Sequence, residues 1–266
     1  MKKLAILIVA AMMMILSACG TEKSDGAEKA TKASGSKLEL VKEGALTFSM
    51  TGQYPPLNFK KDGKLTGFDV EIGTEIAKRI GLEANPVTNP WETIIQGLKA
   101  KKYDAIIGSM TATPDRDKQV DFTNPYYLSG AQIFVAESNS DIQSKEDLKG
   151  KKIGVIQAST WKDMAEELSD QVKGYPTDVN ALQDLALGRL DAVITDKIVG
   201  VSAKNEKGLK IKEIGDLLNE DRVSVAIAEG NKELADKINK AIQSMIDDGT
   251  YEKISMKWFN TNIMKK

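Results

Sequence analysis

The chain has 266 residues, is 41% hydrophobic and 28% charged, and carries a formal net charge of −1. This composition is that of a globular protein, so collagen-like, coiled-coil and mainly disordered chains are excluded, and the absence of a basic excess argues against nucleic-acid binding. There is no histidine and a single cysteine, which excludes Ser-His-Asp and Cys-His catalysis, histidine-ligated metal sites and an intrachain disulfide. We expect neither a metal site nor a cofactor.

Residues 1–18 have the pattern of a secretory signal peptide. Lys2 and Lys3 form a positive segment, and Leu4 to Leu16 is an apolar run of 13 residues, shorter than the roughly 20 residues of a membrane-spanning helix. The run ends at Leu-Ser-Ala-Cys, with the cysteine at position 19. This end resembles the lipobox of bacterial lipoproteins, in which the cysteine is lipidated and becomes the first mature residue.

The lipobox resemblance implies that Cys19 carries acyl chains such as palmitate and anchors the protein at the outer face of the cell membrane. The alternative is a plain secretory signal beside a chance cysteine. Residues 21–36 are small or polar and lack a large apolar side chain, so residues 19–36 are predicted to form a flexible lipidated tether.

Strands and helices alternate from residue 38 onward. Strands are predicted at 45–50, 83–87, 103–107, 133–136, 153–156, 190–194 and 223–228, and helices at about 67–80, 91–100, 160–168, 178–187, after Asp196, at 232–247 and at 251–259. Asp69 is expected to cap the first of these helices, and Gly81 to end it. Such alternation predicts α/β lobes with largely parallel sheets.

One sequence pattern occurs twice. LKAKKYDAII at 98–107 and LGRLDAVI at 187–194 each combine a helix end, a basic turn, Asp-Ala and an apolar strand, and each is followed by polar residues. Ligands of open α/β sheets bind beyond the carboxyl ends of the strands. The repeat therefore predicts two lobes that direct polar strand ends at a shared cleft, the alternative being chance similarity of two short joints.

The segment GSMTATPDR at 108–116 predicts a small-anion site. It would leave a buried strand at Gly108, with Thr113 as a helix cap and a proline at the first helical position. Ser109 and Thr111 would supply hydroxyls and Arg116 a guanidinium fork. Alternatively, Arg116 pairs with a neighbouring aspartate on a wet surface.

Five further residues are candidates for the same cleft. Tyr54 and Trp91 follow loop residues and could expose their rings, although lone aromatic residues more often cover the core. Ser159 and Thr160 open a helix after a strand and supply donors at its N-terminus. Asp196 could accept from an ammonium group or simply cap the next helix.

Taken together, the chain resembles the solute-binding proteins of polar amino-acid ABC importers from about Leu46 to Phe259. The segments that carry this resemblance are QYPPLNF (53–59), KLTGFDVEI (64–72), KAKKYDAIIGSMTATPDR (99–116), VDFTNPYY (120–127), DLKGKKIGVIQAST (147–160), GRLDAVITD (188–196) and DDGTYEKISMKWF (247–259). The resemblance implies a two-lobed periplasmic-binding-protein type II fold, in which two open α/β lobes are joined by two crossing hinge strands.

The crossings are expected near Ser129 to Val135 and Arg222 to Ile227. Residues 37–130 and 226–266 would form lobe 1, and residues 131–225 would form lobe 2. The C-terminal helices would thus return to lobe 1, and closure of the lobes on a ligand would present the closed form to the transporter.

The family analogy also assigns roles to the candidate residues. Arg116 would grip the ligand α-carboxylate with help from Ser109 and Thr111, and Asp196 would take the α-ammonium. Lobe 2 would add contacts from Ser159 and Thr160, and the rings of Tyr54 and Trp91 would sandwich the side chain. A zwitterion presents both charges within a few ångströms, so a site with Arg and Asp at its two poles complements it.

The resemblance further implies a protein without catalytic activity that acts as a monomer with an ABC permease and its ATPase. Relatives that take cationic amino acids often carry a carboxylate at the position of Thr51, so we expect an uncharged polar ligand such as cystine or glutamine. Ala158 and Trp161 are further departures that would shape the pocket.

Three alternatives stay open at this point. Some relatives of this fold are dehydratases or lyases, and Glu92 or Asp115 could then act as an acid or base. A ligand-binding sensor lipoprotein with a separate signalling partner is the second alternative. A purely structural lipoprotein is the third, although it would not require polar residues at successive strand ends.

Overall fold

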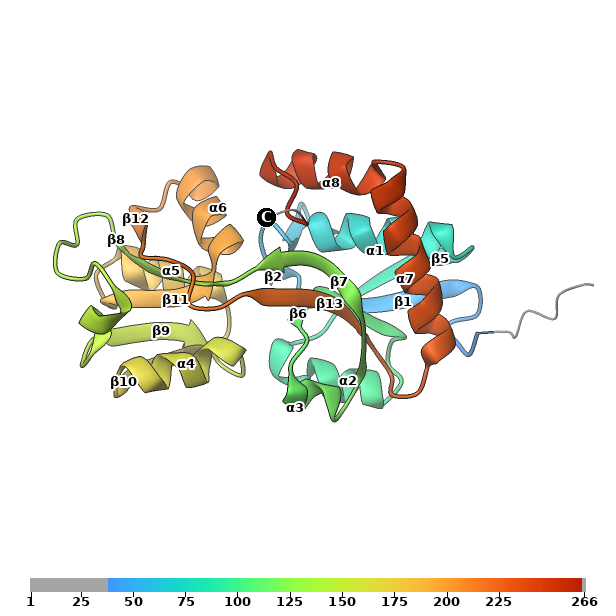
Figure 1. Ribbon diagram of the computed structural model, residues 1–266, viewed down its shortest axis with the longest axis horizontal. Coiled ribbons are helices and arrows are strands. Elements are labelled where there is room, and N and C mark those ends of the chain that lie inside the picture. The colour runs from blue at the N-terminus through green and yellow to red at the C-terminus, as the bar shows by residue number, and fades with distance from the viewer. Residues whose placement is uncertain (1–37, 265–266) are drawn as a thin grey trace, which may run out of the picture. The chain divides into compact units, whose positions relative to one another are not determined.

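The structure is a computed structural model that describes residues 38–264. The predictions for the signal peptide, the tether and Cys19 lie outside the described residues. Within the described residues the chain forms two five-stranded sheets and a small three-stranded sheet, shown in Figure 1.

The first sheet has the strand order β5-β1-β6-β13-β7. These strands are β5 (Glu83–Thr88), β1 (Ala45–Met50), β6 (Ala105–Thr111), β13 (Asp221–Ile227) and β7 (Asp121–Ser129). Strand β1 is parallel to β5 and β6, whereas β13 is antiparallel to β6 and β7. We call this sheet and its helices lobe 1.

Helices cover both faces of the lobe 1 sheet (Figure 1). On one face lie α1 (Phe68–Arg79), α7 (Lys232–Asp247) and α8 (Thr250–Phe259), and on the other lie η1 (Trp91–Thr93) and α2 (Ile94–Lys99). Strand alternation explains this arrangement: Ile106 packs in the cluster of α2, while the adjacent Ile107 packs in the cluster of α1. A strand buried on both faces has the continuous apolar run from which β6 was predicted.

The second sheet has the order β10-β9-β11-β8-β12. Its strands are β10 (Gln171–Tyr175), β9 (Lys152–Ile156), β11 (Ala192–Asp196), β8 (Ala131–Ala136) and β12 (Ile211–Ile214). Helix α4 (Thr160–Leu168) packs on one face through Ala192 and Ile194, and α5 (Asp178–Ala186) and α6 (Lys197–Lys207) pack on the other face, around Val193. We call this sheet and its helices lobe 2.

The chain changes sheets twice. It passes from β7 to β8 at Gly130 and returns between Ile214 and Asp221, and the two lobe 1 strands at the crossing pair as Asp221 with Ser129. An outgoing and a returning segment side by side must run in opposite directions, so each sheet is mixed and not largely parallel. The crossing expected at Arg222 to Ile227 falls inside β13, which is paired within lobe 1. The residue boundaries of the two lobes stay a prediction.

The remaining elements are short. The small sheet consists of β2 (Gln53–Tyr54), β3 (Asn58–Lys61) and β4 (Lys64–Thr66), and the short helices are α3 (Pro114–Asp117) and η2 (Lys145–Leu148). The sequence did not predict the small sheet, nor β7, β10 and β12, because charged residues and a proline interrupt their apolar alternation.

The start of α1 differs from its prediction. Gly67 is the N-cap residue, with a φ of 126°, and a Cβ at this position would clash with the carbonyl oxygen of Leu57. Asp69 does not cap the helix; its carboxylate is buried and accepts hydrogen bonds from other elements. Asp69 therefore binds side chains of other elements and does not cap the helix in which it lies.

Candidate functional site

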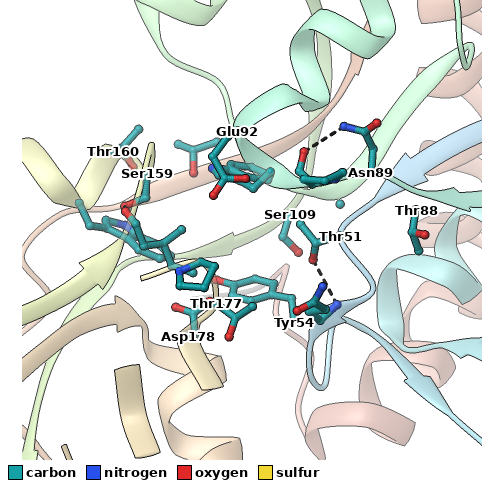
Figure 2. Close-up of a pocket in the computed structure, with 18 of the residues that line it drawn as sticks. Thr51, Tyr54, Thr88, Asn89, Glu92, Ser109, Ser159, Thr160, Thr177 and Asp178 are labelled. Carbon is teal, nitrogen blue, oxygen red and sulfur yellow. Dashed lines mark hydrogen bonds between the residues drawn. The ribbon is translucent and has the colours of Figure 1, made fainter. Parts of the chain in front are cut away.

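A cavity of about 310 Å³ is lined by residues of both lobes. Figure 2 shows its lining side chains. Lobe 1 contributes residues after β1, at the C-terminal ends of β5 and β6 and in α3. Lobe 2 contributes residues from the end of β9 to the start of α4 and at the start of α5. In each lobe the lining therefore follows the carboxyl ends of parallel strands, where open α/β sheets bind ligands.

The lobe 1 wall is held by a hydrogen-bond network around Asp69. Its carboxylate accepts from Asn58 Nδ2 at 2.6 Å, from Ser109 Oγ at 2.8 Å and from the Tyr126 hydroxyl at 2.8 Å. Ser109 has a left-handed backbone with φ 62°, and its N–H donates to the Tyr126 hydroxyl oxygen. Burial raises the pKa of Asp69 to about 6, against the lowering effect of these hydrogen bonds. The network fixes the strand end that faces the cavity.

Arg116 presents a guanidinium group to the cavity. Thr113 caps α3 by accepting from the Arg116 N–H at 3.3 Å, as predicted. Arg116 Nη1 donates to the Thr111 carbonyl oxygen at 2.9 Å, and its Cζ lies 5.3 Å from the centre of the Trp91 ring. Burial lowers the pKa of Arg116, and the charge of Asp221 opposes that shift.

Arg116 forms no ion pair with any of the residues described by the structure. The surface alternative, pairing with Asp117 or Asp121, is therefore not observed, and Asp121 accepts instead from the Gly230 N–H. A guanidinium whose donors lack a carboxylate and face a cavity is suited to bind an anionic group.

The lobe 2 wall begins where β9 ends. Ser159 is the N-cap residue of α4, and its hydroxyl donates to the Ile156 carbonyl oxygen. Thr160 is the first residue of the helix and lines the cavity. The Trp91 Nε1 of lobe 1 donates to the Ala158 carbonyl oxygen of lobe 2 at 3.2 Å. This bond joins the two walls directly.

Two aspartates of lobe 2 lie near this wall, with different surroundings. Asp196 caps α6 by accepting from the Ile198 N–H at 2.7 Å, and the same oxygen accepts from Ser129 Oγ at 2.8 Å. Asp178 lines the cavity, and its Oδ1 accepts from Thr195 Oγ1. Burial raises the pKa of each carboxyl to about 7.

Seven of the eight predicted binding residues line one cavity: Tyr54, Trp91, Ser109, Thr111, Arg116, Ser159 and Thr160. Asp196 is not among the lining residues. Sequence reasoning missed Asp178, which was considered only as the start of a helix. The sequence did contain an indication. Thr177 directly precedes Asp178 and supplies the helix cap, so a cap does not account for the carboxylate at position 178.

Two residues considered for acid–base chemistry are separated. Glu92 is exposed and lines the cavity, whereas Asp115 lies outside it and pairs with Lys118 at 2.7 Å.

Across residues 38–264 there is no cluster of three or more metal-binding side chains, and no helix in that range is long and apolar enough to cross a membrane.

Comparison with known proteins identifies the family. Residues 46–261 match the bacterial extracellular solute-binding proteins, family 3. The chain belongs to this family. It is 34% identical to the L-cystine-binding protein TcyJ of Escherichia coli K12, over 86% of this chain and 88% of that protein. It is also 34% identical to the probable amino-acid-binding protein YxeM of Bacillus subtilis 168, over 99% of this chain and 97% of that protein.

Solved structures support the same fold. An ancestral arginine-binding protein bound to glutamine has a TM-score of 0.77 and 39% sequence identity, and the match covers 82% of this chain and 99% of that chain. The prediction of a two-lobed periplasmic-binding-protein type II fold is thus confirmed. As a member of an extracellular solute-binding family, the chain functions outside the cytoplasm.

Proposed function

We propose that this protein binds a free amino acid in the cavity between its lobes and delivers it to the permease of an ABC transporter. The observation that carries the proposal is a cavity lined from both lobes, with the unpaired Arg116 guanidinium on the lobe 1 wall and the buried Asp196 carboxylate of lobe 2 near the lining residue Tyr54. A zwitterion complements such a pair of charges, and a ligand that contacts both lobes favours the closed arrangement.

In this proposal Arg116 binds the α-carboxylate, and Ser109 and Thr111 add contacts from lobe 1. Ser159 and Thr160 contribute donors from the start of α4 in lobe 2. The rings of Tyr54 and Trp91 enclose the ligand side chain, which their place in the lining supports.

Asp196 stays the proposed acceptor of the α-ammonium. Asp196 is 2% exposed, and its charge is the second cause, after burial, that raises the pKa of the cavity-lining residue Tyr54. Asp196 does not line the cavity in this structure. The proposal therefore requires the ligand ammonium to reach a carboxylate that lies behind the lining residues.

We propose an uncharged polar amino acid, cystine or glutamine, as the ligand. TcyJ is named for cystine, and the ancestral arginine-binding protein was solved bound to glutamine. Thr51 lines the cavity and carries no charge, and its hydroxyl lies 3.1 Å from Asn58 Oδ1. A cationic side chain would find no carboxylate at that position.

The mature protein is proposed to be a monomer anchored through lipid at Cys19, after removal of residues 1–18, with residues 19–36 as a tether to the two lobes. We also propose that it has no enzymatic activity, because the relatives TcyJ and YxeM are both named as binding proteins.

A thermal-shift screen of the full chain in mild detergent tests the function. Each of the twenty amino acids and cystine is added at about 1 mM. A ligand with a micromolar dissociation constant stabilises the folded state by about 4 kcal/mol at that concentration, which raises the melting temperature by several degrees. We expect one or a few responders among uncharged polar amino acids. A flat panel would contradict the amino-acid assignment.

A further inference from the structure

Asp178 occupies a place in the fold that helix formation does not explain. It is the first residue of α5 and is 1% exposed. Thr177 already caps this helix, because its hydroxyl oxygen accepts from the Asn180 N–H at 3.2 Å. A carboxylate at position 178 is therefore not needed as the helix cap.

The two oxygens of Asp178 differ. Oδ1 accepts a hydrogen bond from Thr195 Oγ1, whereas Oδ2 is buried without any hydrogen-bond partner. Asp178 also lines the cavity, where Figure 2 places it beside Thr177 and Tyr54. Buried polar atoms are nearly always hydrogen-bonded, since an unpaired one costs free energy. The missing donor is one that a bound molecule can supply.

The charges around Asp178 also indicate that its carboxylate lacks a partner within the protein. The ionisable groups near Tyr54 are Asp196, Asp178, Tyr127 and Asp221, and the charge of each raises the pKa of Tyr54. Asp178 makes no ion pair with the residues that the structure describes. Among residues 38–264, Arg116 is the only arginine that lines this cavity, and the proposed function assigns its guanidinium to the ligand carboxylate.

In the proposed function, Arg116 and Asp196 together balance the zwitterion of an amino acid. Asp178 then remains as an additional acceptor with no partner. We propose that Asp178 is a specificity-determining carboxylate, which selects amino acids whose side chain offers it an N–H donor, such as the amide of glutamine or the distal ammonium of cystine, over those whose only distal group is a carboxylate. This inference rests on the proposed function and deepens it, because it names the part of the ligand that lobe 2 recognises.

Two disulfides related to cystine test the proposal. The mixed disulfide of L-cysteine with cysteamine keeps the distal ammonium and lacks the distal carboxylate. The mixed disulfide of L-cysteine with 3-mercaptopropionate has the reverse pattern. Their dissociation constants are measured by calorimetry on the full chain, together with L-glutamine and L-glutamate as a second matched pair.

For the wild type we expect the cysteamine disulfide and glutamine to bind at least about tenfold more tightly than their acidic counterparts, because a charge-assisted hydrogen bond stabilises them and repulsion opposes the counterparts. In Asp178→Asn both preferences should shrink to within about threefold. Asp163→Asn, which removes an exposed carboxylate of α4 outside the cavity, should keep the wild-type ratios.

The outcomes separate the two proposals. If the wild type binds these amino acids and Asp178→Asn keeps the same ratios, the role of Asp178 is wrong while the proposed function stands. If Asp178→Asn weakens both members of each pair equally, Asp178 binds the shared α-ammonium, and the side-chain assignment is overturned. Asp196→Asn is expected to show that uniform loss. If no probe and no amino acid binds the wild type, the proposed function itself fails, and this inference with it.

Discussion

The two walls of the cavity are built differently. On the lobe 1 wall, Asp69 receives three side-chain hydrogen bonds, and Ser109 is held at both its N–H and its hydroxyl. On the lobe 2 wall, Asp178 keeps a buried oxygen without a donor. Lobe 1 is therefore organised before a ligand arrives, whereas lobe 2 leaves a polar group that a ligand can satisfy. Preorganisation of one wall reduces the ordering cost of binding.

The hinge connects these two walls. Ser129 of β7 donates to Asp196 of lobe 2, and Trp161 Nε1 of lobe 2 lies 3.3 Å from Asp221 Oδ2 at the start of β13. Side chains of the lobe 2 wall thus bond to both strands that cross between the lobes. A ligand that moves these side chains therefore also acts on the strands that cross between the lobes.

The largest expected effect tests the organised wall. Asp69→Ala removes the acceptor of three buried or partly buried donors, so we expect the free energy of unfolding to fall by about 3–5 kcal/mol. Urea denaturation measures it. Asp170→Ala, at an exposed turn of lobe 2, should change it by less than about 0.5 kcal/mol. Equal losses in the two variants would show that the Asp69 network does not stabilise lobe 1.

The next effect concerns the cation on the lobe 1 wall. Arg116→Ala should weaken amino-acid binding about 100-fold, because the ligand carboxylate loses charge-assisted hydrogen bonds. Calorimetry measures the dissociation constant. The control is Arg189→Ala, whose guanidinium pairs with Asp184 at 2.8 Å on an exposed surface away from the cavity. Unchanged affinity in Arg116→Ala would contradict the carboxylate assignment.

The third prediction concerns the buried carboxyls without ligand. Burial raises the pKa of Asp178 and Asp196 to about 7, and that of Asp69 to about 6. Between about pH 4 and 7 the folded protein therefore binds more protons than the unfolded chain, whose carboxyl pKa values are near 4. Stability must then fall as the pH rises through this range.

We accordingly expect a lower urea midpoint at pH 8 than at pH 5, with a smaller decrease in Asp178→Asn. Asp184 has the opposite shift, because hydrogen bonds lower its pKa to about 2, but its contribution is complete above about pH 4. A midpoint that rose from pH 5 to pH 8 would show that the aspartates of the cavity are not destabilised by burial.

The smallest effect tests the bond that joins the walls. Trp91→Phe keeps an aromatic ring and removes the Nε1 donor to the Ala158 carbonyl oxygen, which is expected to cost about 0.5–1.5 kcal/mol. If closure and binding are coupled, the affinity should fall about two- to tenfold, with a larger radius of gyration by X-ray scattering. Trp258→Phe removes an indole N–H that has no partner and should change neither quantity.

Local patterns predicted most elements of both lobes. The helix at 160–168 and the strand at 45–50 have the predicted bounds, because apolar periodicity and helix-capping residues are encoded within a few neighbouring positions. The same holds for Thr113 as the cap of α3. The small sheet of β2, β3 and β4 was missed, because partly exposed strands with several lysines lack that periodicity.

Candidate residues of the cavity were predictable where they follow strand ends. Arg116 and Thr160 stand beside such ends, and the structure brings them to one cavity. Asp178 was missed because its free oxygen depends on Thr195, 17 positions away, and on Thr177 taking the capping role. Asp69 was misassigned for the same reason, since Ser109 and Tyr126 are 40 and 57 positions away.

The sequence by itself determined the α/β alternation, the family and the positions of most polar residues around the cavity, because each of these is written in short segments. Only the tertiary structure decided which carboxylates are satisfied and which remains open to a ligand. It also decided that the returning strand β13 pairs with lobe 1 from Asp221 onward. The physical reason is the same in both cases: the partner of a buried polar group or a strand is set by packing between distant segments.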